Sequence, residues 1–219
     1  MLRKTLSGVS AGVMISIGGA VYLACENKIV GAVLFTVALL TICIKGYSLY
    51  TGKIGFIPEK HDAESLSTLF LGLLGNTIGT LFCGLIIRFG MPSLGETAEV
   101  LCTAKLVGQS PLSTLVRGIF CGILMYIAVS IYREKWQIVG ILFAIPVFIL
   151  AGFEHSIADM FYFTAAGFVN WRCLPFVALV LIGNSLGSML LPTLNNAWAG
   201  KKEAAAPAVV NDPYPEDVL

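Results

Sequence analysis

Three ionisable residues interrupt a long apolar segment of this chain. No charged residue occurs from Ile138 to Phe153 or from Met160 to Asn170, but Glu154, His155 and Asp159 lie between these two runs. An ionisable group at membrane depth costs roughly 2.5–3.5 kcal/mol on insertion scales, so such groups face a protein interior or a water-filled path. The cluster therefore indicates a functional break inside a membrane-spanning helix.

The composition is that of an integral membrane protein. Hydrophobic residues make up 57% of the 219 residues and charged residues only 12%, against about 25% charged residues in a soluble domain. The net charge of +1 gives no indication of nucleic-acid binding. Most of the cysteines fall in apolar runs without metal-site spacing, so we expect them to pack between helices and expect no metal and no cofactor. The cysteines are Cys25, Cys43, Cys83, Cys102, Cys121 and Cys173.

Six apolar runs approach the length of about 20 residues that crosses a bilayer. They are Leu6–Ala24, Ile29–Ile44, Leu66–Ile87, Leu115–Tyr132, the interrupted Ile138–Asn170, and Cys173–Trp198. The first run is longer than the apolar region of a typical signal peptide. A polar stretch, Arg88–Thr114, separates the first three runs from the last three, and the polar residues 199–219 are expected to form a disordered tail. The sequence thus predicts an all-α membrane protein with one six-span domain over residues 1–198.

The distribution of basic residues predicts the orientation. Six spans place both termini on one side of the membrane. The basic residues on that side are Arg3, Lys4, Lys53, Lys60, Arg133, Lys135, Lys201 and Lys202. Those on the other side are Lys28, Arg88, Lys105, Arg117 and Arg172. The positive-inside rule therefore favours cytoplasmic termini for a multi-pass protein of the inner (plasma) membrane.

The two halves of the chain, about residues 1–90 and 110–198, share a pattern. Gly75–Gly79 reads GNTIG in the third span, and Gly183–Gly187 reads GNSLG in the sixth. The second span is broken near Tyr47–Gly52, and the fifth at the charged cluster. Three spans per half would invert the second half relative to the first, and paired broken helices indicate a substrate path because irregular backbone at membrane depth lines a cavity. The alternative is that the GNxxG segments only allow close helix packing.

His155 is the main candidate for chemistry. It is either a structural histidine tied to a neighbouring helix, or a hydrogen-bond donor and proton source for an anion in the path. The second role suits an imidazole, because its ordinary pKa lies near neutral pH and small changes in its surroundings move its charge. A shared proton would let a weak-acid anion cross the driest zone as its neutral acid. Thr51 is the matching candidate in the other break, where a hydroxyl and exposed amides can donate to an anion.

Glu154, Asp159 and Lys105 are further candidates with charged side chains. Glu154 is expected to accept hydrogen bonds from backbone or amide donors at the break. Asp159 would cap the short second half of the broken helix or pair with a basic residue. Lys105 is either a solvated lysine or a cation that attracts anions into a vestibule, where low-dielectric walls focus its field.

Three apolar side chains lie near these candidates along the chain. Phe35 and Leu39 are one helical turn apart on the second span, and Phe148 precedes His155 by about two turns. Side chains at such spacing usually belong to the core or face lipid. A ring of them above and below a histidine would instead gate a path by excluding water.

The segment Gly152–Phe161, which reads GFEHSIADMF, resembles the signature of the formate/nitrite transporter family, small-anion channels of prokaryotes and some protists. Leu49–Gly52 resembles the loop in the broken second helix of that family, Arg117–Ile119 the start of its fourth helix, and Gly183–Asn184 its sixth. The GFEHS motif is specific and the others are supportive. The resemblance covers all six spans.

The resemblance implies an aquaporin-like fold of two inverted three-helix repeats, assembled as a homopentamer with a pore through each protomer. By motif, His155 would be the central pore histidine and Thr51 its partner from the other break. Lys105 would be the vestibule lysine, and Asn184 the amide near the histidine.

The resemblance also implies two constrictions and shows departures from the family pattern. Phe35 and Phe148 would form the outer constriction, with Leu39 and Leu49 contributing to the inner one. Family members often carry asparagine where this chain has Gly122, and many carry asparagine where it has Asp159. A long amphipathic N-terminal helix common in the family is missing.

These features predict a channel or proton-coupled carrier in the lipid bilayer for small monovalent anions such as formate, nitrite or hydrosulfide. The loop at residues 46–55 resembles the hydrosulfide-channel branch. The alternative is a neutral-solute channel of aquaporin type, although the Asn-Pro-Ala signature is missing. An intramembrane enzyme is disfavoured, since the chain has no nucleophile motif and no HExxH zinc site.

Overall fold

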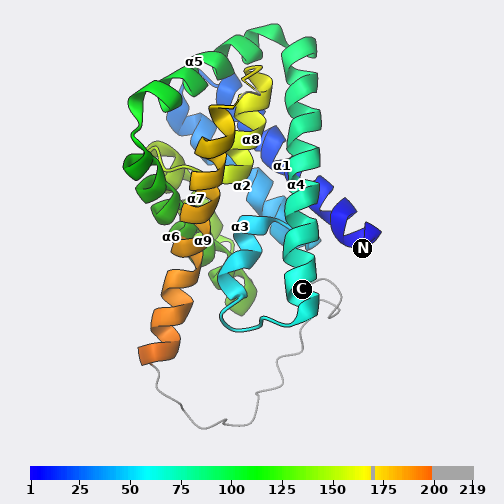
Figure 1. Cartoon of the computed structure of the whole chain (residues 1–219), viewed down its shortest axis with the longest axis vertical. Helices are drawn as coiled ribbons and strands as arrows, with labels where there is room; N and C mark the ends of the chain where they lie inside the picture. The colour runs from blue at the N-terminus through cyan, green and yellow to red at the C-terminus, as the bar shows by residue number, and fades with distance from the viewer. Residues whose placement is uncertain (169–170, 199–219) are drawn as a thin grey trace.

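The computed structural model describes residues 1–168 and 171–198, and these form a bundle of helices without strands (Figure 1). The α-helices are α1 (Leu2–Ala24), α2 (Lys28–Lys45), α3 (Tyr50–Lys53), α4 (Ala63–Gly90), α5 (Pro92–Gly108), α6 (Pro111–Lys135), α7 (Val139–Leu150), α8 (Ser156–Ala165) and α9 (Cys173–Trp198). A short 3₁₀ helix, η1 (Ile54–Phe56), follows α3. The predicted tail at residues 199–219 lies outside the described residues.

Five helices in the described part of the chain are long and apolar enough to cross a membrane: α1, α2, α4, α6 and α9. They contain the predicted first, second, third, fourth and sixth runs. The predicted fifth run divides into α7 and α8, each too short to cross a bilayer alone. The break at residues 151–155 separates them, as the charges in this segment predict. The other predicted break lies between α2 and α3.

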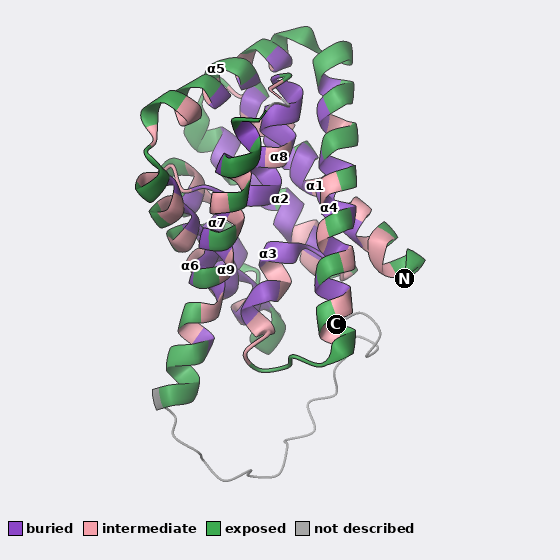
Figure 2. Ribbon diagram, viewed as in Figure 1, coloured by how far each residue is buried: buried purple, intermediate pink, exposed green. Residues whose placement is uncertain are grey.

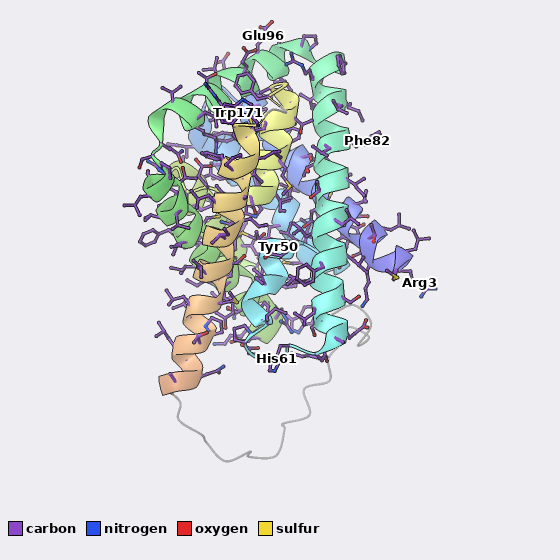
Figure 3. All side chains as sticks on the ribbon, viewed as in Figure 1. Arg3, Tyr50, His61, Phe82, Glu96 and Trp171 are labelled. Atoms are coloured by element: carbon purple, nitrogen blue, oxygen red, sulfur yellow. The ribbon has the colours of Figure 1, made fainter. Side chains whose placement is uncertain are left out.

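The region between the two halves differs from the expectation of a polar connection. Most of Arg88–Thr114 forms α5, which lies across one end of the bundle (Figure 1). Pro92 occupies its first turn, where the missing N–H has no intrahelical partner to lose. Because α5 has a low content of apolar residues, hydropathy does not identify it as a membrane span. Glu96 on α5 and His61 before α4 mark opposite ends of the molecule (Figure 3).

The GNxxG segments pack two pairs of helices closely. A Cβ atom on Gly75 of α4 would clash with the backbone of Thr5 on α1, and one on Gly187 of α9 would clash with the backbone of Ile119 on α6. Backbones approach this closely only where small residues lie at the crossing. The packing role considered for these glycines is therefore present in both halves.

Many large apolar side chains are exposed on the outside of the bundle, and buried residues concentrate along its axis (Figure 2). On α4 the exposed side chains include Phe70, Leu74, Phe82 and Phe89, and Phe82 points away from the bundle (Figure 3). Polar side chains are buried inside, among them Thr51, Asn76, His155 and Asn184. This distribution suits a protein surrounded by lipid or by other subunits.

Candidate functional site

Two buried asparagines hold the two helix breaks in the same way. Asn76 of α4 donates from Nδ2 to the carbonyl oxygens of Gly8 (2.9 Å) and Ser48 (2.8 Å), and its Oδ1 accepts from the backbone N–H of Tyr50 (2.9 Å). All hydrogen-bonding groups of this side-chain amide are therefore used on the backbone. The amide replaces the helical partners that the first break removes.

Asn184 of α9 makes the equivalent bonds in the second half. Its Nδ2 donates to the carbonyl oxygens of Gly118 (2.9 Å) and Glu154 (2.8 Å), and its Oδ1 accepts from the N–H of Ser156 (2.9 Å). Asn184 thus holds the backbone on both sides of His155. Since both of its N–H groups are engaged, its side chain acts here as a support for the break.

The two sets of bonds also align the breaks residue by residue. Ser48 corresponds to Glu154 and Tyr50 to Ser156, so Leu49 occupies the position equivalent to His155. Thr51, the predicted counterpart of His155, lies two residues further along the chain. It is a neighbour of the histidine in space rather than its equivalent by position.

Thr51 and His155 meet where the two breaks approach each other. Thr51 Oγ1 lies 2.8 Å from His155 Nε2, and both side chains are buried. His155 also forms the N-cap of α8, because its Nδ1 accepts from the N–H of Ala158 at 3.2 Å. An imidazole that accepts at Nδ1 carries its proton on Nε2 in the neutral form, so Nε2–H donates to Thr51. The hydroxyl hydrogen of Thr51 then remains free to donate elsewhere.

Aromatic rings extend from this pair toward α2 and α7. The ring of Phe148 is stacked at 5.9 Å from that of His155, and Phe35 contacts Phe148 edge to face at 6.3 Å between centroids. Both phenylalanines are buried. The structure thus brings together the histidine and the two residues expected to form the outer constriction.

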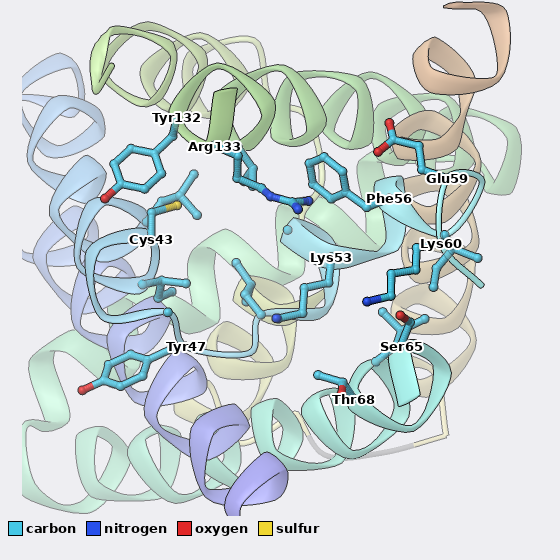
Figure 4. Close-up of a pocket in the computed structure, with 18 of the residues that line it drawn as sticks. Cys43, Tyr47, Lys53, Phe56, Glu59, Lys60, Ser65, Thr68, Tyr132 and Arg133 are labelled. Atoms are coloured by element: carbon cyan, nitrogen blue, oxygen red, sulfur yellow. The ribbon is translucent and has the colours of Figure 1, made fainter. Parts of the chain in front are cut away.

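A cavity of about 480 Å³ lies on the other side of the pair, at the end of the bundle that carries α3 and η1 (Figure 4). Leu39 and Leu49 are part of its lining, and both are fully buried. The two predicted members of the inner constriction therefore both line this cavity. Neither Thr51 nor His155 is part of this lining, and Thr51 follows Leu49 by two residues along the chain.

Charged side chains from three elements line the cavity. They are Lys53, Glu59, Lys60, Arg133 and Glu134. Lys60 pairs with Asp62 at 3.9 Å, and the Arg133 guanidinium lies 4.0 Å from the Phe56 ring centroid. Lys53 lies outside the five candidate spans; burial, with the like charges of Arg133 and Lys4, lowers its pKa to about 8. Lys53 was not among the predicted site residues, although its place two residues after Thr51 is a signal that could have indicated it.

Lys105 lies on α5, at the opposite end of the bundle from α3 (Figure 1). Its Nζ contacts Glu154 Oε2 and lies 2.8 Å from Asp159 Oδ1. Its side chain is 13% exposed, which excludes the solvated alternative. Of the two roles considered for Asp159, the structure has the pairing with a basic residue, whereas His155 takes the capping role.

Glu154 has one further partner that the sequence did not indicate. Gln109, at the C-terminal end of α5, donates from Nε2 to Glu154 Oε1 at 2.5 Å. Nothing in the polar stretch between the halves distinguishes this glutamine from its neighbours. Asn76 could have been found, since it occupies the same place in GNTIG as Asn184 does in GNSLG.

Gly122 explains one departure from the family pattern. A Cβ atom at this position of α6 would clash with the backbone of Asn184. Ser188 also donates to the Gly122 carbonyl oxygen at 3.0 Å. The site is a close helix crossing, and no polar side chain fits there without moving α9.

Comparisons with known proteins agree with this geometry. The profile of the Formate/nitrite transporter family matches residues 1–198. The nitrite transporter NirC of Salmonella typhimurium is 29% identical over 199 residues, which cover 82% of this chain and 74% of NirC. The formate channel FocA of Haemophilus influenzae is 23% identical over 180 residues, covering 71% of this chain and 63% of FocA. The chain thus spans just under two thirds of that channel.

Two solved structures have the same fold. An FNT family ion channel superposes with a TM-score of 0.74 at 22% identity, over 91% of this chain and 89% of that protein. A pentameric formate channel with formate bound gives a TM-score of 0.71 at 21% identity, over 90% and 96% of the two chains.

Proposed function

The chain belongs to the formate/nitrite transporter family, and on this basis we propose that it conducts small monovalent anions across a membrane, with formate, nitrite and hydrosulfide as the candidate substrates. The observation that carries this proposal is the hydrogen bond between Thr51 and His155, which joins the two broken helices close in sequence to Leu49, a residue that lines the charged cavity. The cavity, the two leucines, Thr51 and His155 would each contribute one step to the passage of an anion.

The cavity would collect the anion and the leucines would dehydrate it. Leu39 and Leu49 present no polar atom that could replace water around an ion. Only a solute small enough to pass between them, and able to recover hydrogen bonds beyond them, would cross. Thr51 supplies the next donor, since its hydroxyl hydrogen is not used on His155.

His155 would then donate from Nε2 to the anion in place of Thr51. An anion beside a neutral imidazole favours the protonated ring, so the pair can share a proton and the solute can move as its neutral acid. The aromatic pair Phe35 and Phe148 bounds this zone on the far side. We expect a weak-acid anion to pass more readily than chloride, which cannot carry a proton.

The wider architecture follows from the same family. We propose six spans in two inverted repeats, over about residues 1–90 and 110–198, with α7 and α8 forming the fifth span. The equivalent bonds of Asn76 and Asn184 support this symmetry. A homopentamer, with cytoplasmic termini in the plasma membrane, would cover part of the apolar outer surface, and lipid would cover the rest.

Flux measurements on the protein in liposomes test the proposal. Formate, nitrite and hydrosulfide flux should exceed that of chloride and of a neutral solute such as urea. His155→Phe should slow it about tenfold, as expected when a donor worth about 1.4 kcal/mol is lost from the path. His61→Phe, at an exposed histidine that does not line the cavity, is the matched control. Unchanged flux of all three anions in His155→Phe would contradict the mechanism, and equal flux of urea would favour a neutral-solute channel.

A further inference from the structure

The cluster of Lys105, Glu154 and Asp159 holds more negative than positive charge. One ammonium faces two carboxyl groups, and the side chains of Glu154 and Asp159 are only 3% and 1% exposed. If both carboxyl groups were ionised, the cluster would carry one net negative charge in the interior of the bundle. An uncompensated buried charge is strongly unfavourable, so a proton on one carboxyl group balances the cluster.

The hydrogen bonds identify the position of that proton. Three of the four carboxyl oxygens have partners: Glu154 Oε1 accepts from Gln109, and Lys105 contacts both Glu154 Oε2 and Asp159 Oδ1. The fourth, Asp159 Oδ2, is buried and has no hydrogen-bond partner among the described residues. A buried carboxylate oxygen without a donor is costly, whereas the same oxygen can carry a proton.

We propose that Asp159 is a proton-binding residue that determines which solutes the path admits. With a proton on Oδ2 the cluster is neutral, and when this proton leaves to water or to a basic solute the cluster carries one negative charge beside His155. That charge repels an anion at the histidine. Entry of an anion is thus linked to retention of the proton at Asp159, which favours weak acids over anions that cannot bring a proton. This inference rests on the proposed anion transport.

The surroundings of Asp159 contain no second lysine or arginine among the described contacts that could replace the proton. The titratable side chains that interact with Asp159 or with Lys105 are Tyr22 of α1, Cys102 of α5, Cys121 of α6, Glu154 and His155 of the break, and Tyr162 of α8. The Lys105 ammonium also lies 5.9 Å from the Tyr162 ring centroid. Lys105 is therefore the cation against which both carboxyl groups are balanced.

Asp159→Asn reproduces the neutral state of the cluster permanently. An asparagine has the same shape and keeps an oxygen for Lys105, but it cannot ionise. Formate flux of Asp159→Asn and of the wild type should be measured from mildly acidic to mildly alkaline pH in liposomes. The ratio of the two fluxes cancels the bulk ionisation of formic acid, which is the same for both proteins.

We expect the formate flux of Asp159→Asn divided by that of the wild type to be near one at acidic pH and to rise to about ten at alkaline pH. A factor of about ten is the lower end of the change in local ion concentration that a charge produces in a low-dielectric cleft. Chloride flux should also rise in Asp159→Asn. Glu96→Gln makes the same chemical change at an exposed carboxylate of α5. The pH profile of its formate flux should be the same as that of the wild type. A flat ratio with both proteins active would overturn the proposal.

Infrared spectroscopy gives a readout that does not depend on transport. The wild type at acidic pH should show the C=O band of a buried protonated carboxyl group, which is lost at alkaline pH and missing from Asp159→Asn. If no protein conducts anions but this band titrates, the proposed transport fails and the proton site stands. If the wild type conducts anions but shows no such band, the proton site is wrong, whether or not Asp159→Asn folds.

Discussion

Thr51 Oγ1 and His155 Nε2 lie 2.8 Å apart, although 104 positions separate the two residues in the chain. Thr51 lies in α3, directly after the break that follows α2, and His155 lies in the break before α8. The bond therefore connects the two halves of the molecule at its centre. The tautomer of His155 is set by the N–H of Ala158, which occupies Nδ1, so Nε2 carries the hydrogen that meets Thr51.

Replacing Thr51 by valine should impair both folding and transport. The valine has nearly the same volume but leaves the Nε2–H of His155 buried without an acceptor, which costs about 1–3 kcal/mol of stability. The last donor before the histidine is lost at the same time. Formate flux in liposomes and the thermal unfolding midpoint in detergent would both fall. Thr51→Ser keeps the hydroxyl and should retain most of the formate flux and of the thermal stability. An equal loss of flux and stability in Thr51→Ser and Thr51→Val would contradict a role of the hydroxyl.

Lys53 should make anion entry from the cavity side dependent on pH. Burial and the nearby charges of Arg133 and Lys4 lower its pKa to about 8, so it is charged below this pH and loses its charge above it. Wild-type formate flux from this side should exceed that of Lys53→Met by about tenfold at neutral pH, through local concentration of the anion. The difference should disappear at alkaline pH. Lys60→Met removes an exposed lysine of the same cavity, and a similar loss in this control would argue against a specific role of Lys53.

Loss of either asparagine amide should destabilise the fold strongly. Asn184→Ala removes the hydrogen-bond partner of the Glu154 carbonyl oxygen and of the Ser156 N–H at the break, and we expect the free energy of unfolding to fall by roughly 2–4 kcal/mol. Asn76→Ala should cost a similar amount, because its bonds are equivalent. Asn195→Ala, at an exposed position of α9, should change the unfolding midpoint little. The measurement is thermal or denaturant unfolding of the solubilised protein.

Phe148→Ala should widen the path on the far side of the histidine. The substitution removes a ring that contacts both Phe35 and His155, so larger anions such as acetate should pass faster relative to formate. Truncating a buried phenylalanine should also lower stability by roughly 3–5 kcal/mol. Phe143→Ala, on an exposed position of the same helix, is the control. Unchanged acetate selectivity in a folded Phe148→Ala protein would show that the ring does not limit the path.

The apolar spans and both breaks could be predicted from the sequence, because they depend on local composition. The runs that become α1, α2, α4, α6 and α9 follow directly from their length and hydrophobicity. α5 could not be predicted in this way, because it contains fewer apolar residues than the spans and because its position depends on packing across the end of the bundle.

The members of the site could be predicted from local sequence, whereas the partnership of Thr51 with His155 was implied only by the family resemblance. His155 was identified by its cost at membrane depth and Thr51 by its place in the other break. That they touch depends on how two loops fold toward each other, and no local pattern encodes this. Likewise, the sequence gives Lys105 a charge but does not reveal that Glu154 and Asp159 both bind it. Lys53 and Gln109 become notable only through what surrounds them.

The two asparagines also limit how the path can open. Moving either break would disrupt three buried hydrogen bonds of one amide at once, whereas rotating Leu39 or Leu49 about its side-chain bonds disrupts none. We therefore expect opening to consist of leucine rotamer changes in a stationary backbone. Such changes are faster than collective movements of helices. Permeation would then proceed without an alternating-access cycle, and the rate should follow the anion gradient without saturating at a conformational turnover limit.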